Sequence, residues 1–279
     1  MAKLKMTATV VSQAQLAEGI YDLRLKAGEI ASQAAAGQFV SVYSKDGSRL
    51  LPRPISLCGI DREAGELRLV YRIAGAGTEE FSTLKAGDTV DILGPLGNGF
   101  PLKEGKKAFL IGGGIGVPPM LELAKELKRL NGAELVQSVM GYRNSQTFLM
   151  DEFKDCGSVY AATEDGSCGT KGNVLDAIRE NGLDAEVIYA CGPAPMLRAL
   201  KAYAKEKGIQ CWISLEEKDG LRRGCLSGLC LPVQGKRRTF SGTQQAHLQG
   251  RPCIPGRRDR TVKEERIREY ECKYCRRGI

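Results

Sequence analysis

Histidine is almost missing from this chain of 279 residues. The only one is His247, so residues 1 to 218 contain no imidazole that could act as a general base. Long apolar runs are missing too: no stretch approaches the roughly 18 consecutive apolar residues of a membrane-spanning helix, so no membrane association is expected. The first residues, MAKLKMTATVVSQAQ, lack the apolar core and small-residue cleavage site of a secretory signal. The expected compartment is the cytoplasm.

The composition is that of a soluble globular protein, with 42% hydrophobic and 27% charged residues, and the length allows two domains. The net charge of +8 is unevenly placed. From Asp219 onward there are 15 Lys and Arg residues against 6 Asp and Glu residues. A basic tail on a near-neutral body is compatible with a nucleic-acid or acidic partner.

Two patterns of hydrophobic residues divide the chain. Between residues 5 and 100, short β-branched segments such as TATVVSQ, QFVSVYS, ELRLVYRI and DTVDIL alternate with turns, which predicts an antiparallel barrel over residues 1–100. GPLGNGF at 94–100 is expected to form a turn-rich hinge. Over residues 101–215, strand-like segments alternate with helical ones such as PPMLELAKELKRLNG. That alternation predicts a doubly wound parallel sheet, an α/β domain.

Three motifs in the first hundred residues combine cations, hydroxyls and glycine. The strand segment Arg53-Pro54-Ile55-Ser56 places a guanidinium that can pair with a phosphate three residues before a hydroxyl that can bind a flavin edge. Val70-Tyr71-Arg72 adds an aromatic ring and a second cation. Gly77-Thr78, at a helix start, offers N–H groups and a hydroxyl to a pyrophosphate. An Arg-Pro strand edge is also common as a purely structural feature, so the first motif gains its weight from the others.

The strongest local motif is the glycine-rich segment IGGGIGVPP at 111–119, between a predicted strand and a predicted helix. Its glycines, Gly112, Gly113, Gly114 and Gly116, would let the backbone approach the pyrophosphate of a dinucleotide. The alternative is a tight turn without a ligand.

Two further strand ends are candidates for the same nucleotide. Glu164 and Asp165 follow a strand, where carboxylates can accept hydrogen bonds from ribose hydroxyls. They would repel a 2′-phosphate, and no arginine is expected nearby to receive one, so NAD(H) is predicted over NADP(H). Cys191-Gly192 ends the next strand, where a small residue can lie against the nicotinamide. Cys191 could equally be a packed core residue.

Taken in order, RPIS, VYR, GT, GPLGNGF, IGGGIGVPP, TEDGSCGTKG and YACGPAPML resemble the ferredoxin reductase-type flavoproteins. Over roughly residues 6–218 they resemble, within that family, the electron-transfer subunits of dihydroorotate dehydrogenase B. The resemblance implies an FAD-binding barrel, an NAD-binding domain and a C-terminal [2Fe–2S] domain. It assigns residues 53–56, 70–72 and 77–78 to FAD. It also implies a dihydroorotate-oxidising catalytic subunit as partner in a heterotetramer of pyrimidine biosynthesis, with electrons passing through the cluster and FAD to NAD⁺.

The C-terminal segment departs from this family. The ferredoxin-like spacing C-x4-C-x2-C should follow Glu217, but here Cys225 and Cys230 share a C-x4-C spacing and position 233 is Val. Removing one G from permitted codons for Lys218 to Leu221 yields Met-Ala-Cys-Gly, then the full C-x4-C-x2-C spacing, a later cysteine and a stop codon. We therefore interpret residues 216–279 as the remnant of the iron–sulfur domain, out of frame and irregular from about Asp219. A genuine, divergent basic tail is the alternative.

The remaining features of the tail support no separate site. His247, Cys253, Cys272 and Cys275 lack the paired knuckles of a zinc site, so no metal is predicted. The basic excess lies almost wholly in the suspect segment and lacks interleaved aromatic residues, so no nucleic-acid partner is predicted. Two rival functions stay open: the small subunit of a ferredoxin-NAD(P) oxidoreductase, and a basic-tailed binding protein on an inactive flavoprotein fold.

Overall fold

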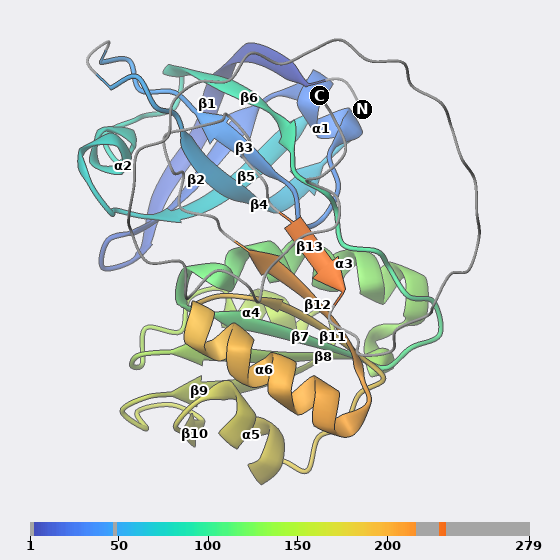
Figure 1. Ribbon diagram of the computed structural model, residues 1–279. Helices are drawn as coiled ribbons and strands as arrows, with labels where there is room; N and C mark the ends of the chain where they lie inside the picture. Colours follow the sequence, from blue (N-terminus) through green and yellow to red (C-terminus); the bar gives the residue numbers. More distant parts are fainter. Residues whose placement is uncertain (1–2, 47–48, 216–228, 233–279) are drawn as a thin grey trace, which may run out of the picture. The chain divides into compact units, whose positions relative to one another are not determined.

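The computed structural model describes residues 3–46, 49–215 and 229–232. Its elements form a closed barrel and a seven-stranded sheet flanked by helices (Figure 1). The predicted fold class is therefore confirmed. Among the described residues, no helix is both long and apolar enough to cross a bilayer.

The barrel has the strand order β1-β2-β5-β4-β3-β6, and its neighbouring strands are antiparallel. Alternate side chains on its strands point inward, and Leu23, Leu25, Leu67 and Leu69 are fully buried. The strands are β1 (Leu4–Ala17), β2 (Ile20–Lys26), β3 (Phe39–Val42), β4 (Arg53–Asp61), β5 (Glu66–Arg72) and β6 (Thr89–Leu96). Two short helices, α1 (Gly28–Gln33) and α2 (Ala76–Phe81), lie between strands.

The second part is a sheet of order β10-β9-β8-β7-β11-β12-β13, parallel except at its last pair. Its strands are β7 (Ala108–Gly113), β8 (Val136–Tyr142), β9 (Ser158–Thr163), β10 (Thr170–Lys171), β11 (Val187–Cys191), β12 (Gln210–Leu215) and β13 (Leu229–Pro232). The connecting helices are η1 (Gly114–Gly116), α3 (Pro118–Asn131), η2 (Ala133–Leu135), α4 (Met150–Lys154), α5 (Val174–Glu180) and α6 (Ala194–Lys207).

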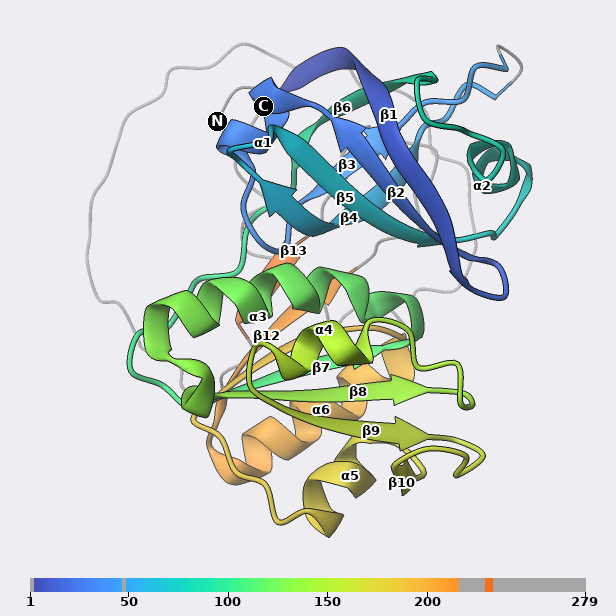
Figure 2. The same cartoon turned by 180° about the vertical axis from the view of Figure 1, so that it is seen from behind.

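The two faces of the parallel sheet bury alternate residues of β7. Leu110 packs in a cluster with residues of α3 and with Phe153 of α4, whereas Phe109 and Ile111 pack against α5 and α6. Figure 2 shows α3 and α4 on one face of the sheet and α5 and α6 on the other. The cluster around α3 also includes barrel residues such as Ile20 and Val70. Apolar packing is therefore continuous from the barrel through α3 to the sheet.

Two details differ from the sequence prediction. Gly94 to Leu96 belong to β6 instead of a turn, and the last barrel strand ends at Leu96. The second difference lies in the segment expected to be irregular. There β13 pairs antiparallel with β12, with Trp212 opposite Pro232, so that expectation is wrong at these four residues. The edge of β12 presents unpaired N–H and C=O groups, which a further strand satisfies. The rest of the predicted out-of-frame segment, 216–228 and 233–279, lies outside the described residues.

Candidate functional site

The structure brings two of the predicted flavin motifs into contact. Arg53 begins β4 and Gly77 lies in the first turn of α2, yet a Cβ at Gly77 would stand 2.7 Å from Arg53 Nε and 2.9 Å from Nη2. The guanidinium therefore lies against the bare backbone of Gly77. Arg53 Nη1 also donates to the carbonyl of Leu51, which fixes its direction. Arg53 forms no ion pair with any described residue, so its charge is available to an anion.

The loop before α2 uses the hydroxyl of Thr78 for its own structure. Thr78 Oγ1 accepts hydrogen bonds from the N–H groups of Ala74 (2.8 Å) and Gly75 (3.2 Å), and donates to the carbonyl of Gly75 at 2.9 Å. The expectation of a free hydroxyl for a pyrophosphate is therefore not met. The side chain instead orders the turn in which Gly77 faces Arg53.

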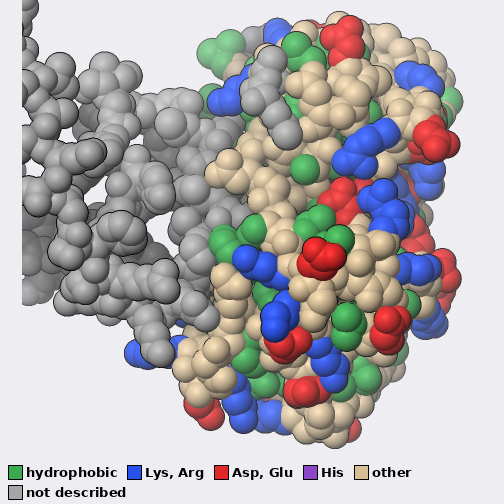
Figure 3. All heavy atoms as spheres, turned by 90° about the vertical axis from the view of Figure 1, so that its right-hand side faces the viewer, with side chains coloured by type: hydrophobic (Ala, Val, Ile, Leu, Met, Phe, Trp, Pro, Cys, Tyr) green, Lys and Arg blue, Asp and Glu red, His purple; other side chains and the backbone are tan. Residues whose placement is uncertain are grey.

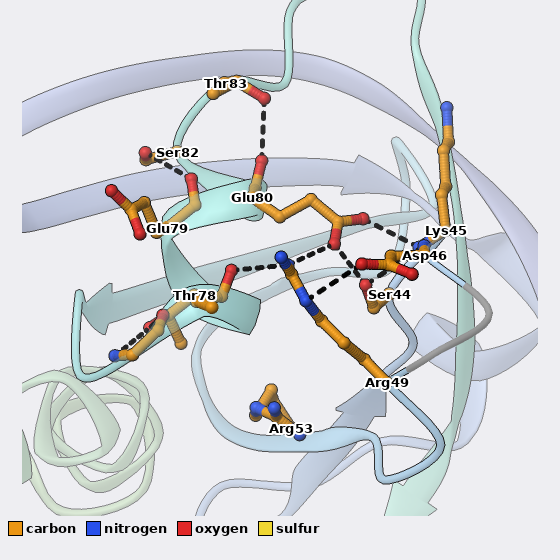
Figure 4. A network of polar contacts seen from close by, with 12 residues as sticks. Ser44, Lys45, Asp46, Arg49, Arg53, Thr78, Glu79, Glu80, Ser82 and Thr83 are labelled. Carbon is orange, nitrogen blue, oxygen red and sulfur yellow. Dashed lines mark hydrogen bonds and ion pairs between the residues drawn. The ribbon is translucent and has the colours of Figure 1, made fainter.

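A polar network that the sequence analysis did not identify ties the loop before β4 to α2 (Figure 4). Glu80 of α2 accepts hydrogen bonds from the backbone N–H of Lys45 (2.7 Å), from Arg49 Nη1 (2.8 Å) and from the Ser44 hydroxyl. Arg49 Nη1 also donates to the carbonyl of Ala76 at 2.6 Å. Burial opposes ionisation of Glu80, but the hydrogen bonds from Ser44 and Lys45 outweigh it and hold its pKa below the ordinary value. The network keeps the strand bearing Arg53 beside α2.

The three residues of the VYR motif differ in burial. Val70 and Tyr71 are buried, and the Tyr71 ring stacks on Tyr21 with centroids 5.9 Å apart. The Tyr71 hydroxyl is 3.1 Å from Gln13 Oε1. Alternation along β5 turns the Tyr71 ring into the barrel core, so the assignment of Val70 and Tyr71 to FAD stays a prediction. Arg72, the next residue, is exposed.

A cavity of about 780 Å³ lies at the carboxyl ends of the parallel strands, where α/β folds bind nucleotides. Arg72 reaches it from the barrel. The other lining residues come from the sheet and its helices: Gly113, Gly114, Ile115, Gly116, Gly141, Tyr142, Arg143, Glu164, Gly172, Asn173, Val174, Leu175, Arg179, Gly192, Pro193, Pro195, Met196 and Ala199. The predicted glycine-rich segment and strand ends are thus brought together around one hollow.

Two different causes explain the glycines at this turn. Gly114 has φ +54°, a left-handed conformation that favours glycine, and a Cβ there would meet nothing within 4 Å. Gly116 is required by packing, since its Cβ would lie 2.3 Å from the carbonyl oxygen of Cys191. A Cβ at Gly112 or Gly113 would lie 2.7 Å from a methionine sulfur. Packing therefore accounts for three glycines, whereas Gly114 leaves backbone open beside the cavity.

The two acidic residues that follow β9, Glu164 and Asp165, have different surroundings. Glu164 lines the cavity, whereas Asp165 accepts hydrogen bonds from the hydroxyl of Ser167 (2.6 Å) and from its backbone N–H (2.9 Å), which lower the pKa of Asp165. Arg143 and Arg179 line the same cavity. The expectation that no arginine lies near the carboxylates is therefore wrong. Arg143 follows β8, and adjacent parallel strands end at the same edge of the sheet, which places it beside the residues that follow β9.

Strand β11 ends at Cys191, beside Gly112 of β7. Cys191 is 2% exposed and lies opposite Gly112 in the sheet, and Gly192 lines the cavity. The Cys191 side chain is thus a packed core residue, and Gly192 provides the open surface. Within the described ranges, no group of three His, Cys, Asp or Glu residues could hold a metal. His247 and the tail cysteines, except Cys230 in β13, lie outside these ranges.

Comparison with known proteins agrees with this architecture. Residues 110–202 match the family described as oxidoreductase NAD-binding domain. Among solved structures, a chain of the NADH-dependent reduced ferredoxin-NADP oxidoreductase is 29% identical with a TM-score of 0.70, covering 79% of this chain and 80% of that one. A ferredoxin reductase of carbazole 1,9a-dioxygenase, at 22% identity and a TM-score of 0.65, covers 75% and 67% and shares the fold. The barrel, the sheet and the cavity define a ferredoxin reductase-type oxidoreductase.

Curated relatives narrow the family. The "Dihydroorotate dehydrogenase B (NAD(+)), electron transfer subunit" of Geobacillus sp. (strain WCH70) is 46% identical over 227 residues, covering 80% of this chain and 85% of the relative. The protein of the same name from Bacillus cereus (strain B4264) is 43% identical over 231 residues, covering 81% and 86%. The chain belongs to this family of electron transfer subunits.

Proposed function

We propose that this chain carries electrons between a dihydroorotate-oxidising partner and NAD⁺, with FAD bound in the barrel and NAD(H) in the cavity, as a step of pyrimidine biosynthesis. One observation carries the proposal. The cavity at the glycine-rich turn is lined by residues of the α/β part and also by Arg72, the last residue of barrel strand β5. A nucleotide held there lies beside the barrel, as transfer of a hydride between two bound cofactors requires.

The residues present fit FAD. Arg53 presents a guanidinium without an ion-pair partner among the described residues, braced by Leu51 and lying against the backbone of Gly77. Ser56 is half-buried on the same strand and is our candidate for the flavin edge. When bound, FAD can exchange a hydride with nicotinamide and single electrons with an iron–sulfur centre. In this proposal Arg53 neutralises the pyrophosphate and the backbone around Gly77 lets it approach closely.

For NAD(H), the proposal assigns the backbone at Gly114 to the pyrophosphate and Glu164 to a ribose. Gly192 leaves room for the nicotinamide beside Arg72. Residues 1–218 contain no histidine, so no imidazole base for substrate oxidation is available there. We therefore place dihydroorotate oxidation on a separate catalytic subunit, in a cytoplasmic heterotetramer. The [2Fe–2S] cluster of the family depends, for this chain, on the reading frame beyond Lys218.

Anaerobic reduction of the purified chain tests this function. The full chain should purify yellow with close to one FAD, and NADH should bleach the flavin absorbance. A colourless protein that takes up no FAD would favour the alternative of a binding protein on an inactive fold. A yellow protein that NADH does not reduce would refute electron exchange with NAD(H).

A second candidate is a ferredoxin-linked oxidoreductase that uses NADP(H). Arg143 and Arg179 favour it, because both line the cavity that Glu164 also lines and could pair with a 2′-phosphate. Arg179 already forms an ion pair with Asp176 at 3.4 Å. Comparing flavin reduction by NADH and NADPH at equal low concentration separates the two candidates, since only the ferredoxin-linked one requires NADPH to be the faster donor.

A further inference from the structure

Among the described residues, three polar contacts join the barrel to α3 and α4. The backbone N–H of Ile60 donates to Glu122 of α3 at 3.1 Å, and Arg62 pairs with Glu126 of α3 at 3.4 Å. The third contact reaches α4 instead of α3 and has the shortest distances. It joins Arg68 of β5 to Glu152.

The guanidinium of Arg68 is shared by two carboxylates, one from each part of the protein. Its Nε lies 3.0 Å from both carboxylate oxygens of Asp22, on the neighbouring barrel strand β2. Its Nη1 and Nη2 donate to the two oxygens of Glu152, at 2.5 Å and 2.8 Å. The side chains of Arg68 and Asp22 are 11% and 10% exposed, and that of Glu152 is 39% exposed. Bidentate pairs of this kind fix geometry as well as contributing energy.

The position of this pair along the chain connects it to the nucleotide cavity from both sides. Arg68 lies four residues before Arg72, which ends β5 and lines the cavity. Glu152 lies on α4, which follows the loop that begins at Arg143, another lining residue. The apolar packing around α3 holds the two parts together but is non-directional. The bidentate pair is directional and joins β5 to α4.

We propose that the Arg68–Glu152 pair is a positioning clamp that holds the cavity end of β5 in register with the nucleotide-binding part, and thereby sets the rate of hydride exchange between nicotinamide and flavin. This inference rests on the proposed function, because it concerns the approach of the two cofactors. Asp22 keeps Arg68 extended toward α4 and paired within the barrel. Removing Glu152 therefore leaves no buried unpaired charge, and the protein is expected to fold.

The test compares Glu152→Ala with Asp151→Ala in the full chain. Asp151 is the neighbouring carboxylate on α4 and is 92% exposed, and among the described residues its one ion pair is with Lys154 of the same helix. Both variants lose one carboxylate from α4, but only the first loses the contact with the barrel. FAD content, the NADH concentration at half-saturation and the limiting rate of flavin reduction are measured by anaerobic stopped flow. Hydrogen exchange of the α4 and β5 amides is measured without NADH.

For Glu152→Ala we expect unchanged FAD content, faster hydrogen exchange in α4 and a limiting rate lower by about tenfold to a hundredfold, since displacements near 1 Å have effects of that size. Asp151→Ala should match the parent. If Glu152→Ala fails to retain FAD, Glu152→Gln, which keeps the shape, provides the same test with a smaller fall. Equal limiting rates in a folded Glu152 variant and Asp151→Ala would overturn the clamp. Absence of any NADH reduction in the parent would instead refute the proposed function.

Discussion

Replacing Gly77 by alanine should weaken FAD binding without destabilising the protein. The backbone at position 77 is not among the positive-φ residues, so an alanine meets no conformational strain there. Its Cβ would instead stand 2.7 Å from Arg53 Nε. The perturbation therefore acts on the guanidinium of Arg53 and on little else.

The size of the effect follows from this contact. An ordinary contact distance is about 3.5 Å, so the guanidinium must move by roughly 0.8 Å. If that movement removes its bond to the pyrophosphate, the loss is about 1.5–3 kcal/mol, as for other hydrogen bonds to charged groups. This corresponds to roughly a tenfold to hundredfold fall in FAD affinity. In a helix, alanine is favoured over glycine by up to about 1 kcal/mol, so the apoprotein should unfold at the same or a slightly higher temperature.

Fluorescence titration of apoprotein with FAD and thermal unfolding of the apoprotein measure the two effects separately. Arg53→Ala should reproduce the loss of FAD affinity. Arg72→Ala should retain more FAD, because Arg72 lines the nucleotide cavity, whereas the Arg53 guanidinium is held in place by its hydrogen bond to the carbonyl of Leu51. The reasoning is refuted if Gly77→Ala binds FAD like the parent while Arg53→Ala does not. It is also refuted if Arg53→Ala binds FAD normally.

Three further predictions concern other parts of the chain. Burial raises the pKa of Glu122 above its ordinary value of 4.5, because the ionised carboxylate is disfavoured in the folded protein. The stability that Glu122 contributes is therefore full below pH 4.5 and is lost as the pH rises through the pKa of the folded state. Glu122→Gln should therefore raise the unfolding temperature at pH 7, with no gain near pH 4, as differential scanning calorimetry would show; an equal gain at both pH values would contradict this. NADH should reduce the flavin faster than NADPH at low concentration, and Glu164→Ala should narrow the difference because Arg143 remains; a variant with the parent's ratio would exclude Glu164 as the selecting group. The protein with this sequence should bind no [2Fe–2S] cluster. A protein expressed from DNA that lacks the one extra base near codon 219 should gain about two iron and two sulfide ions per chain. Stoichiometric iron and sulfide in the protein with the present sequence would disprove the frameshift.

The elements with a regular hydrophobic period could be predicted from the sequence. The β-branched segments of the first hundred residues became the barrel strands β1, β3, β5 and β6, and the glycine-rich turn lies between β7 and α3 as predicted. These patterns are local, because alternation or helical spacing decides which side chains face the core. Strand β13 has no comparable signal, since its four residues depend on the free edge of β12.

The roles of individual polar residues could be predicted less well, for a physical reason. Tyr71 and Thr78 are suited by chemistry to bind a cofactor, yet the first packs into the barrel and the second hydrogen-bonds its own turn. Arg143 was not expected near Glu164 because 21 positions separate them, although the parallel pairing of β8 and β9 brings their strand ends together. Residue type indicates what a side chain can bind, and strand order decides what it meets.

The Arg68 clamp shows why such contacts lie beyond sequence analysis. The two carboxylates that bind Arg68, those of Asp22 and Glu152, are 46 and 84 positions away from it in the sequence. The chain has 41 Lys and Arg residues and 33 Asp and Glu residues. No feature of the neighbouring sequence distinguishes these two pairs from the many other possible pairs of basic and acidic residues. The clamp also depends on register, because a one-residue slip of β5 would turn Arg68 into the barrel and present Leu67 or Leu69 to α4. The same alternation that buries those leucines therefore orients the arginine, so barrel packing and the contact with α4 cannot be changed independently along this strand.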